Sequence, residues 1–246
     1  MQLIRMTPNP CPDRPAMPPD LDKLGLLRLL QLTSPSLPIG AFAWSQGLEA
    51  AVQASWISNE AQATDWLTAV LDHALARLDV PVLLRLHEAI TTQHIDVAAQ
   101  WNRWLLACRE TRELLQEDIH IGAALLRLLL DLDAPVAQRW QATQGRKPLS
   151  YAAAFALATV HADLPARMAA LGYLWAWSEN QATALIKLGV LGQTGAQRLL
   201  GSLHPAIRAA LDLGLSLEDD ELGMALPGLA LASAHHEIQH SRLFRS

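Results

Sequence analysis

Residues 33–49 read TSPSLPIGAFAWSQGLE, and their order is not explained by helix periodicity alone. The leucine-rich residues before this stretch predict a helix that ends near Thr33, because the Ser34-Pro35 pair disfavours helical backbone at Ser34. A proline and a glycine further on keep the stretch irregular, and helical spacing resumes at Phe42. Such a loop between two packed helices is either a tight corner or a binding surface, and spacing alone leaves both open.

The chain around this loop is apolar and weakly acidic. It has 246 residues with a formal net charge of −5, and 51% of the residues are hydrophobic while 17% are charged. The length and the lack of an internal Pro/Gly/Ser-rich linker predict one domain. The low charge content indicates extensive apolar surface that the chain or a partner protein covers. Without a cluster of Lys and Arg, we expect no nucleic-acid partner.

The N-terminal residues differ in composition from the rest. Residues 1–20 contain six prolines and no continuous apolar segment, so we expect a disordered leader rather than a signal peptide. No uncharged apolar run approaches the roughly 20 residues that span a bilayer. The two cysteines, Cys11 and Cys108, suggest neither a disulfide framework nor a thiolate metal site. These features predict a cytoplasmic protein with no membrane segment.

Helical spacing recurs along the chain, and no stretch alternates apolar and polar residues between hairpin turns. The sequence therefore predicts an all-α, single-domain helical bundle of about ten helices over residues 21–226, followed by a tail at 227–246. Three of the expected helices cover residues 135–145, 148–159 and 164–188. Two prolines should interrupt helices: Val80-Pro81 should break or kink one, and Pro205 should begin another.

A charged segment, CRETRELLQED at residues 108–118, lies inside the helical pattern. It fits a solvated helix face joined by i,i+4 pairs of the Arg109–Glu113 type. It also fits a docking surface on which Arg109 and Arg112 bind carboxylates of a partner, because the guanidinium group is a forked donor.

A second polar group lies within the apolar residues 164–188. Glu179, Thr183 and Lys187 follow one another at a spacing of four, which places them on one helix face. Polar groups on a buried helix need partners. The face is therefore either an internal hydrogen-bonded network or a polar lining at an interface or channel.

The sequence HEIQH, His236 to His240, matches the zinc motif HExxH, in which two histidines one turn apart bind zinc and the glutamate activates water. A catalytic zinc site needs a third protein ligand, and only six residues follow His240. There is also no GxxxxGK[ST] or GxGxxG phosphate-binding motif. We expect no catalytic residue, no metal ligand and no cofactor, with an HExxH-type zinc hydrolase as the alternative.

Four segments together resemble signatures of the urease accessory protein UreF family. They are SPSLPIGAFAWSQGLE (34–49), ACRETREL (107–114), WSENQ…IKLGVLGQTGAQRLL (177–200) and HEIQHSRLFRS (236–246). Their order and spacing resemble that family along nearly all of the chain after residue 20. The resemblance implies a non-enzymatic, all-helical homodimer that acts in nickel delivery to urease.

Proteins of this kind bind the accessory protein UreD, also called UreH, recruit the GTPase UreG, and act on apo-urease within the complex. The resemblance thus implies a scaffold that also regulates the GTPase cycle, and a nickel route that the face at Glu179, Thr183 and Lys187 would suit. The chain departs from the family pattern at Ala41, Leu115, Gly189-Val190 and His240. The last departure explains HExxH as the result of one substitution.

The loop, the charged segment, the end of the long apolar helix and the tail supply the partner-binding candidates. They are Phe42, Trp44, Gln46, Arg109, Glu110, Arg112, Glu113, Lys187, Gln193, His236, Glu237, Arg242, Leu243 and Phe244. The tail carries apolar residues with few expected neighbours in its own chain, and termini are usually mobile unless tied down. We therefore expect the tail to fold against UreD, and its removal to change the stability of the isolated protein little.

Overall fold

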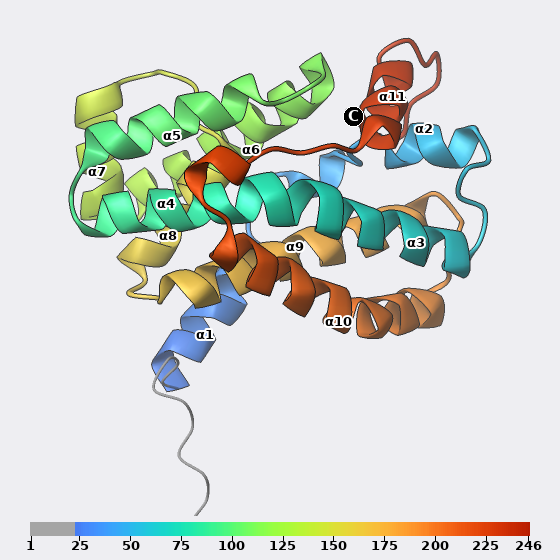
Figure 1. Cartoon of the computed structure of the whole chain (residues 1–246), viewed down its shortest axis with the longest axis horizontal. Coiled ribbons are helices and arrows are strands. Elements are labelled where there is room, and N and C mark those ends of the chain that lie inside the picture. Colours follow the sequence, from blue (N-terminus) through green and yellow to red (C-terminus); the bar gives the residue numbers. More distant parts are fainter. Residues whose placement is uncertain (1–22) are drawn as a thin grey trace, which may run out of the picture.

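The computed structural model describes residues 23–246, so the predictions for the leader at residues 1–20 and for Cys11 lie outside the described part of the chain. Within it, all regular structure is helical and the all-α prediction is confirmed (Figure 1). The elements are α1 (Lys23–Leu32), η1 (Ala41–Ala43), α2 (Leu48–Gln53), α3 (Glu60–Val70), η2 (Leu71–Asp79), α4 (Val80–Thr91), α5 (Ile95–Ala107), α6 (Arg112–Asp131), α7 (Pro135–Gln144), α8 (Tyr151–His161), α9 (Ala166–Lys187), α10 (Gln193–Ser216), η3 (Asp219–Glu221) and α11 (Pro227–His236). None of the helices between residues 23 and 246 combines the length and hydropathy that a bilayer crossing needs.

Helix α8 lies at the centre of the bundle and packs against α4 and α6. Every residue from 152 to 159 is buried, and most of them are alanines. Small side chains allow the neighbouring helices to approach closely. The closest approach is at Gly122 of α6, where an added Cβ would lie 2.2 Å from the carbonyl oxygen of Leu149. Only glycine fits at this crossing.

Residues 60–91 form one helical column through α3, η2 and α4. Of the break or kink expected at Val80-Pro81, the break is wrong, because the column continues through Pro81 from η2 into α4. The π-helical segment η2 directly before it is where the hydrogen-bond ladder changes register. Asp79, the last residue of that segment, is buried within the bundle.

Helix α10 also runs through its proline, so the separate helix expected from Pro205 does not exist. Pro205 and Gly201 are both exposed. The carbonyl group that loses its partner therefore faces water, while Leu203 and Ile207 keep the opposite face buried in the core.

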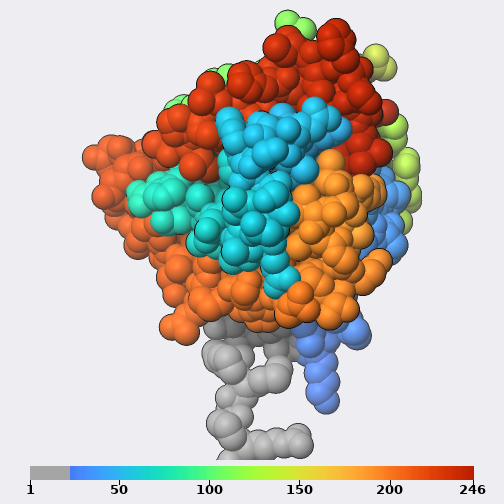
Figure 2. Space-filling model, turned by 90° about the vertical axis from the view of Figure 1, so that its right-hand side faces the viewer, coloured from blue at the N-terminus to red at the C-terminus, as the bar shows by residue number. Residues whose placement is uncertain are grey.

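The C-terminal residues return to the loop at residues 33–49, as Figures 1 and 2 show where the red end of the chain lies beside α2. Phe244 belongs to the hydrophobic core and is 5% exposed, and Ser246 is fully buried. Gly47, with φ 75°, packs so closely on α11 that an added Cβ would lie 2.8 Å from the backbone nitrogen of Ser233. The expectation that the tail lacks neighbours in its own chain is therefore wrong.

Candidate functional site

A group of buried or half-buried polar side chains lies where the loop at 33–49, helix α6 and the C-terminal residues meet. We call it the polar junction. Its members are Ser45, Gln46, Glu49, Asp79, Arg109, Glu113, Glu117, Asp118, Tyr173, Trp177, His236, Arg242 and Ser246. Buried polar groups of this number are stable only when each has a partner, and three linked clusters supply the partners.

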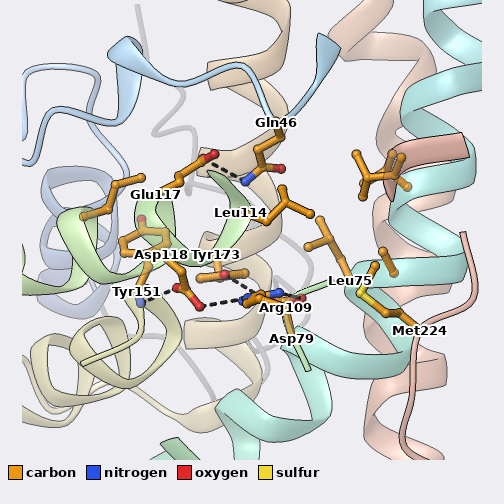
Figure 3. Close-up of a pocket in the computed structure, with 14 residues that line it drawn as sticks. Gln46, Leu75, Asp79, Arg109, Leu114, Glu117, Asp118, Tyr151, Tyr173 and Met224 are labelled. Carbon is orange, nitrogen blue, oxygen red and sulfur yellow. Dashed lines mark hydrogen bonds and ion pairs between the residues drawn. The ribbon is translucent and has the colours of Figure 1, made fainter. Parts of the chain in front are cut away.

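In the first cluster, two aspartates share one guanidinium group (Figure 3). Arg109 Nη2 lies 2.6 Å from Asp79 Oδ1, and Arg109 Nε lies 2.8 Å from Asp118 Oδ2. The Tyr173 hydroxyl donates to Asp79 Oδ1 at 3.1 Å. Burial raises the pKa of Asp118, and the charge of Arg109 opposes that rise. The cluster joins three helical segments through one arginine.

The expected Arg109–Glu113 pair on a solvated helix face is therefore wrong. Helix α5 ends at Ala107, and α6 begins only at Arg112 with the side chain of Thr111 as its cap. Arg109 thus lies in the turn between two helices and points inward, where its side chain is 12% exposed.

The second cluster surrounds His236, which is fully buried. Its Nδ1 lies 2.8 Å from Glu113 Oε2 and its Nε2 lies 3.2 Å from Glu49 Oε2. Each ring nitrogen thus lies within hydrogen-bonding distance of a different carboxyl group, so the imidazole joins α2 to α6. Arg242 Nη1 donates to Glu113 Oε1 at 2.9 Å. Arg242 thus places a positive charge beside one of the two buried carboxyl groups that His236 joins.

Glu49 also holds the C-terminal backbone. Its oxygens accept the N–H groups of Leu243 at 2.8 Å and Phe244 at 2.9 Å. The side-chain amide of Gln239 donates to the same carboxylate at 3.1 Å. A carboxylate that accepts several N–H groups is well solvated by the protein itself. Glu49 therefore fixes the path of the tail.

The same geometry shows how the two histidines of the HExxH segment are arranged. Helix α11 ends at His236, so Glu237 and His240 do not continue it, and His240 is exposed. Both nitrogens of His236 are already bonded to carboxylates. The helix that would place two histidines one turn apart on a zinc ion is not formed here.

The third cluster centres on Glu117. The side-chain amide of Gln46 donates to Glu117 Oε1 at 2.9 Å (Figure 3), and the Ser246 hydroxyl donates to Glu117 Oε2 at 2.9 Å. The indole of Trp177 donates to Gln46 Oε1 at 2.7 Å. Because an indole N–H only donates, it fixes the orientation of the Gln46 amide. The backbone N–H of Ser45 donates to the Ser246 carbonyl at 2.9 Å.

The polar junction brings together the four sequence segments that carry the family resemblance. Gln46 and Glu49 come from the first segment, Arg109 and Glu113 from the second, Trp177 from the third, and the C-terminal residues from the fourth. Segments separated by up to about 200 positions, such as Gln46 and Ser246, are thus joined side chain to backbone.

Sequence reasoning did not single out Asp79, Glu117, Asp118 or Tyr173. For Glu117, however, the sequence contains a local signal of burial. Glu113 and Glu117 are four residues apart on the apolar face of α6, where Ile121 and Leu125 follow at the same spacing. A carboxylate in such a row is buried and must have a partner. Asp79 carries no comparable local signal, because its partner is 30 residues away.

The structure sorts the partner-binding candidates by exposure. Glu110, Arg112, Lys187, Gln193, Arg242 and Leu243 are exposed, Phe42, Gln46, Arg109 and Glu237 are partly covered, and Trp44, Glu113, His236 and Phe244 are buried. The buried candidates support the residues that form the surface, whereas the exposed candidates can contact a partner directly.

The polar face on α9 is occupied by contacts within the chain. Thr183 donates to the carbonyl of Glu179. Lys187 donates to the carbonyl of Phe42 at 3.2 Å, and its Nζ lies 5.4 Å from the centre of the Phe244 ring. Burial raises the pKa of Glu179, which lines a cavity of about 60 Å³ together with Glu117. The face therefore supports the loop and the tail.

Comparison with known proteins identifies the family of the chain. The family model UreF matches residues 57–204. A urease accessory protein UreF from Chromohalobacter salexigens is 52% identical over 226 residues, which are 92% of this chain and 96% of that protein. The chain belongs to the UreF family. UreF proteins of the same description from Alkalilimnicola ehrlichii and Pseudoalteromonas translucida are 50% and 46% identical, over 89% and 93% of this chain and 95% and 97% of theirs. The similarity to these relatives thus covers most of the chain, including residues on both sides of the 57–204 segment.

Proposed function

We propose that this UreF-family chain is a non-enzymatic scaffold in the cytoplasmic complex that delivers nickel, its cargo, to apo-urease. In this role it binds UreD/UreH, recruits the GTPase UreG and regulates its cycle. The observation that carries the proposal is the convergence of the four family-like segments at the polar junction. A scaffold must hold segments from distant parts of the chain in a fixed relation, and linked buried polar contacts do this with directional specificity.

The exposed candidates other than Lys187 lie on three surfaces, one before and at the start of α6, one at the start of α10 and one in the C-terminal residues. Glu110 and Arg112 lie at the beginning of α6, and Gln193 begins α10. Arg112 is exposed and presents a forked donor suited to carboxylates. We propose that these two surfaces contact the GTPase, and that the exposed Arg242 and Leu243 contact UreD/UreH.

Charge reversal tests the GTPase surface directly. Arg112→Glu should reduce co-purification with UreG in the presence of UreD/UreH by at least about tenfold, since reversing one charge at an interface costs several kcal/mol. Gln193→Ala should weaken it less. Arg103→Glu, an exposed arginine on α5, is the matched control and should bind as the unmodified chain does. Unchanged binding of both test variants would show that these surfaces do not contact the GTPase.

We also propose that the chain forms a homodimer through α1. Leu24, Leu26, Leu27 and Leu30 on this helix are exposed, and α1 projects from the body in Figure 2. Directly beside it is an apolar groove of about 350 Å³ between α1, α9 and α10, lined by Leu171, Trp175 and Ile207 among others. A projecting apolar helix next to an apolar groove is self-complementary under twofold symmetry.

The polar face on α9 is the third part of the proposal. Glu179 is the member of that face whose carboxylate lines a cavity, and it therefore suits a site where the cargo ion passes. Glu179→Gln should then lower nickel incorporation into urease in the reconstituted complex without changing assembly. Equal nickel incorporation would remove Glu179 from the route.

A further inference from the structure

Glu117 differs from every other carboxylate of the polar junction in its partners. Glu49 and Glu113 contact the His236 ring, Glu113 also contacts the Arg242 guanidinium group, and Asp79 and Asp118 share Arg109. Glu117, which is 3% exposed, is hydrogen-bonded by the neutral Gln46 amide and the neutral Ser246 hydroxyl. It is therefore a buried carboxylate in contact with neutral donors.

The charges around Glu117 disfavour its ionised form. Asp118 follows it on α6, and across the cluster Asp79, Asp118 and Glu117 would place three negative charges around the single guanidinium of Arg109. The other titratable groups that line the two cavities beside Glu117 are the hydroxyls of Tyr151 and Tyr173, which are neutral at physiological pH, and the carboxyl group of Glu179, whose pKa burial raises. Burial is the larger cause and Asp118 adds to it, so the pKa of Glu117 rises to about 7.

Glu117 also lies between two small cavities. One is about 50 Å³ and the other about 60 Å³, and both are lined by Gln46, Glu117, Ile121, Tyr151 and Tyr173. Each cavity has room for water-sized groups beside the carboxyl group. The carboxyl group therefore adjoins space of the size of a water molecule while it stays out of bulk solvent.

We propose that Glu117 is a proton-dependent latch, which holds the C-terminal residues against the loop at 33–49 when protonated and loosens them when ionised. The latch acts through burial, because the C-terminal residues cover Glu117 and are held there by Ser246, whose hydroxyl bonds Glu117 and whose carbonyl bonds Ser45. Loosening this contact opens Glu117 to water, which solvates the anion better than two neutral donors do.

The direction of the pH effect follows from linkage. The pKa of Glu117 is higher in the closed state than its usual value of 4.5 in an open state. The stabilisation of the closed state is therefore complete below about pH 4.5, falls as the pH rises, and is lost once the pH passes about 7. The opening constant of the tail should rise by up to about tenfold per pH unit in that window and then level off.

Hydrogen exchange of the full chain between pH 5 and 8 tests the latch. The informative amides are those of Arg245, which donates to the Ala43 carbonyl at 2.8 Å, and Ser45, which donates to the Ser246 carbonyl. After correction for intrinsic exchange rates, their protection should fall from pH 5 to about 7 and then level off. In Glu117→Gln, which keeps the shape and cannot ionise, the protection should be higher at pH 7 and nearly independent of pH. The two proteins differ only at residue 117, so the difference between their pH profiles isolates Glu117.

Two further variants complete the design. Glu179→Gln removes a carboxyl group whose pKa is also raised by burial but which has no hydrogen bond to the tail, and it should keep the pH dependence of the unmodified chain. Ser246→Ala removes a donor that favours the ionised carboxylate and so raises the pKa of Glu117. The pH at which amide protection levels off, here called the levelling point, should therefore be higher in this variant. This variant tests the role of Glu117 if Glu117→Gln does not fold. The proposal is overturned if protection in the unmodified chain is flat from pH 5 to 7, if Glu117→Gln keeps its slope, or if Ser246→Ala leaves the levelling point unchanged.

Discussion

At the scale of single residues, the buried arginine of the polar junction has the clearest energetic role. Arg109 lies between Asp79 and Asp118, and no other cation contacts either carboxylate within residues 23–246. Arg109→Met keeps most of the side-chain volume but leaves two buried negative charges. Removing one partner of a buried ion pair costs about 3–5 kcal/mol, so urea unfolding should show a loss of that order.

The matched control for this change is Arg103→Met, at an exposed arginine on α5. It should alter the free energy of unfolding by less than about 0.5 kcal/mol. Equal stabilities for Arg109→Met and Arg103→Met would mean that the Asp79 and Asp118 carboxylates are solvated in another way.

A second prediction at this scale concerns the crossing of α6 over the segment before α8. In Gly122→Ala the new Cβ would lie 2.2 Å from a backbone carbonyl oxygen, so the two elements must separate. Overpacking of this kind costs about 1–3 kcal/mol. Gly201→Ala on α10 meets no atom within 4 Å and should instead stabilise the protein by about 0.5–1 kcal/mol, the usual gain in a helix interior. Thermal melting of both variants measures this difference, and a shift in the same direction for both would contradict it.

At the scale of elements, the C-terminal residues behave as part of the core. Deleting residues 237–246 removes the buried Phe244 and takes from Glu49 the two backbone N–H groups that it accepts. Burial of one such side chain contributes roughly 1.5–3 kcal/mol, and an unsatisfied buried acceptor costs about 1–3 kcal/mol more. The truncated protein should therefore lose at least about 3 kcal/mol of stability, in contrast to the expectation from sequence alone.

Two single substitutions distinguish the loss of one buried side chain from the loss of the whole C-terminal segment. Phe244→Ala should destabilise the protein by about 3–5 kcal/mol, whereas Leu243→Ala, at a side chain that is 60% exposed, should change stability by less than about 1 kcal/mol. Similar melting temperatures for the two variants would show that the tail does not pack as described.

The elements also show which features a sequence can predict. Helices at 135–144, 151–161 and 166–187 lie within a few residues of the expected ranges, because their apolar spacing and their capping residues are local. The helices continue through Pro81 and Pro205, because a π-helical segment directly precedes the first proline and the second faces solvent. The polar junction was only partly foreseen. Its residues were named in part, but the contacts that turn Arg109, Glu113 and His236 inward join positions up to 187 apart, as Glu49 and His236 do, and periodicity carries no information on such pairs.

At the scale of the whole molecule, the polar junction and the face of α1 are separate features. The polar junction lies among α6, α9 and the C-terminal residues, whereas the exposed leucines of α1 adjoin the groove of α9 and α10. Changes at one should therefore leave the other intact, since sites without shared partners act additively. This separation allows the proposed self-association to be tested without disturbing the proposed partner surfaces.

The test replaces two leucines of α1 by charged residues. Leu27 is 63% exposed and Leu30 is 57% exposed, so Leu27→Glu with Leu30→Glu should leave the fold intact, but each charge would have to lose its water to enter the groove of a second copy. Light scattering after gel filtration should show a dimer for the unmodified chain and a monomer for this variant, with unchanged circular dichroism. Leu132→Glu, at a leucine that is 60% exposed near the end of α6, is the matched control and should remain dimeric. A double variant that still elutes as a dimer would place the twofold interface elsewhere on the molecule, and loss of the dimer in Leu132→Glu as well would attribute the effect to added charge rather than to α1.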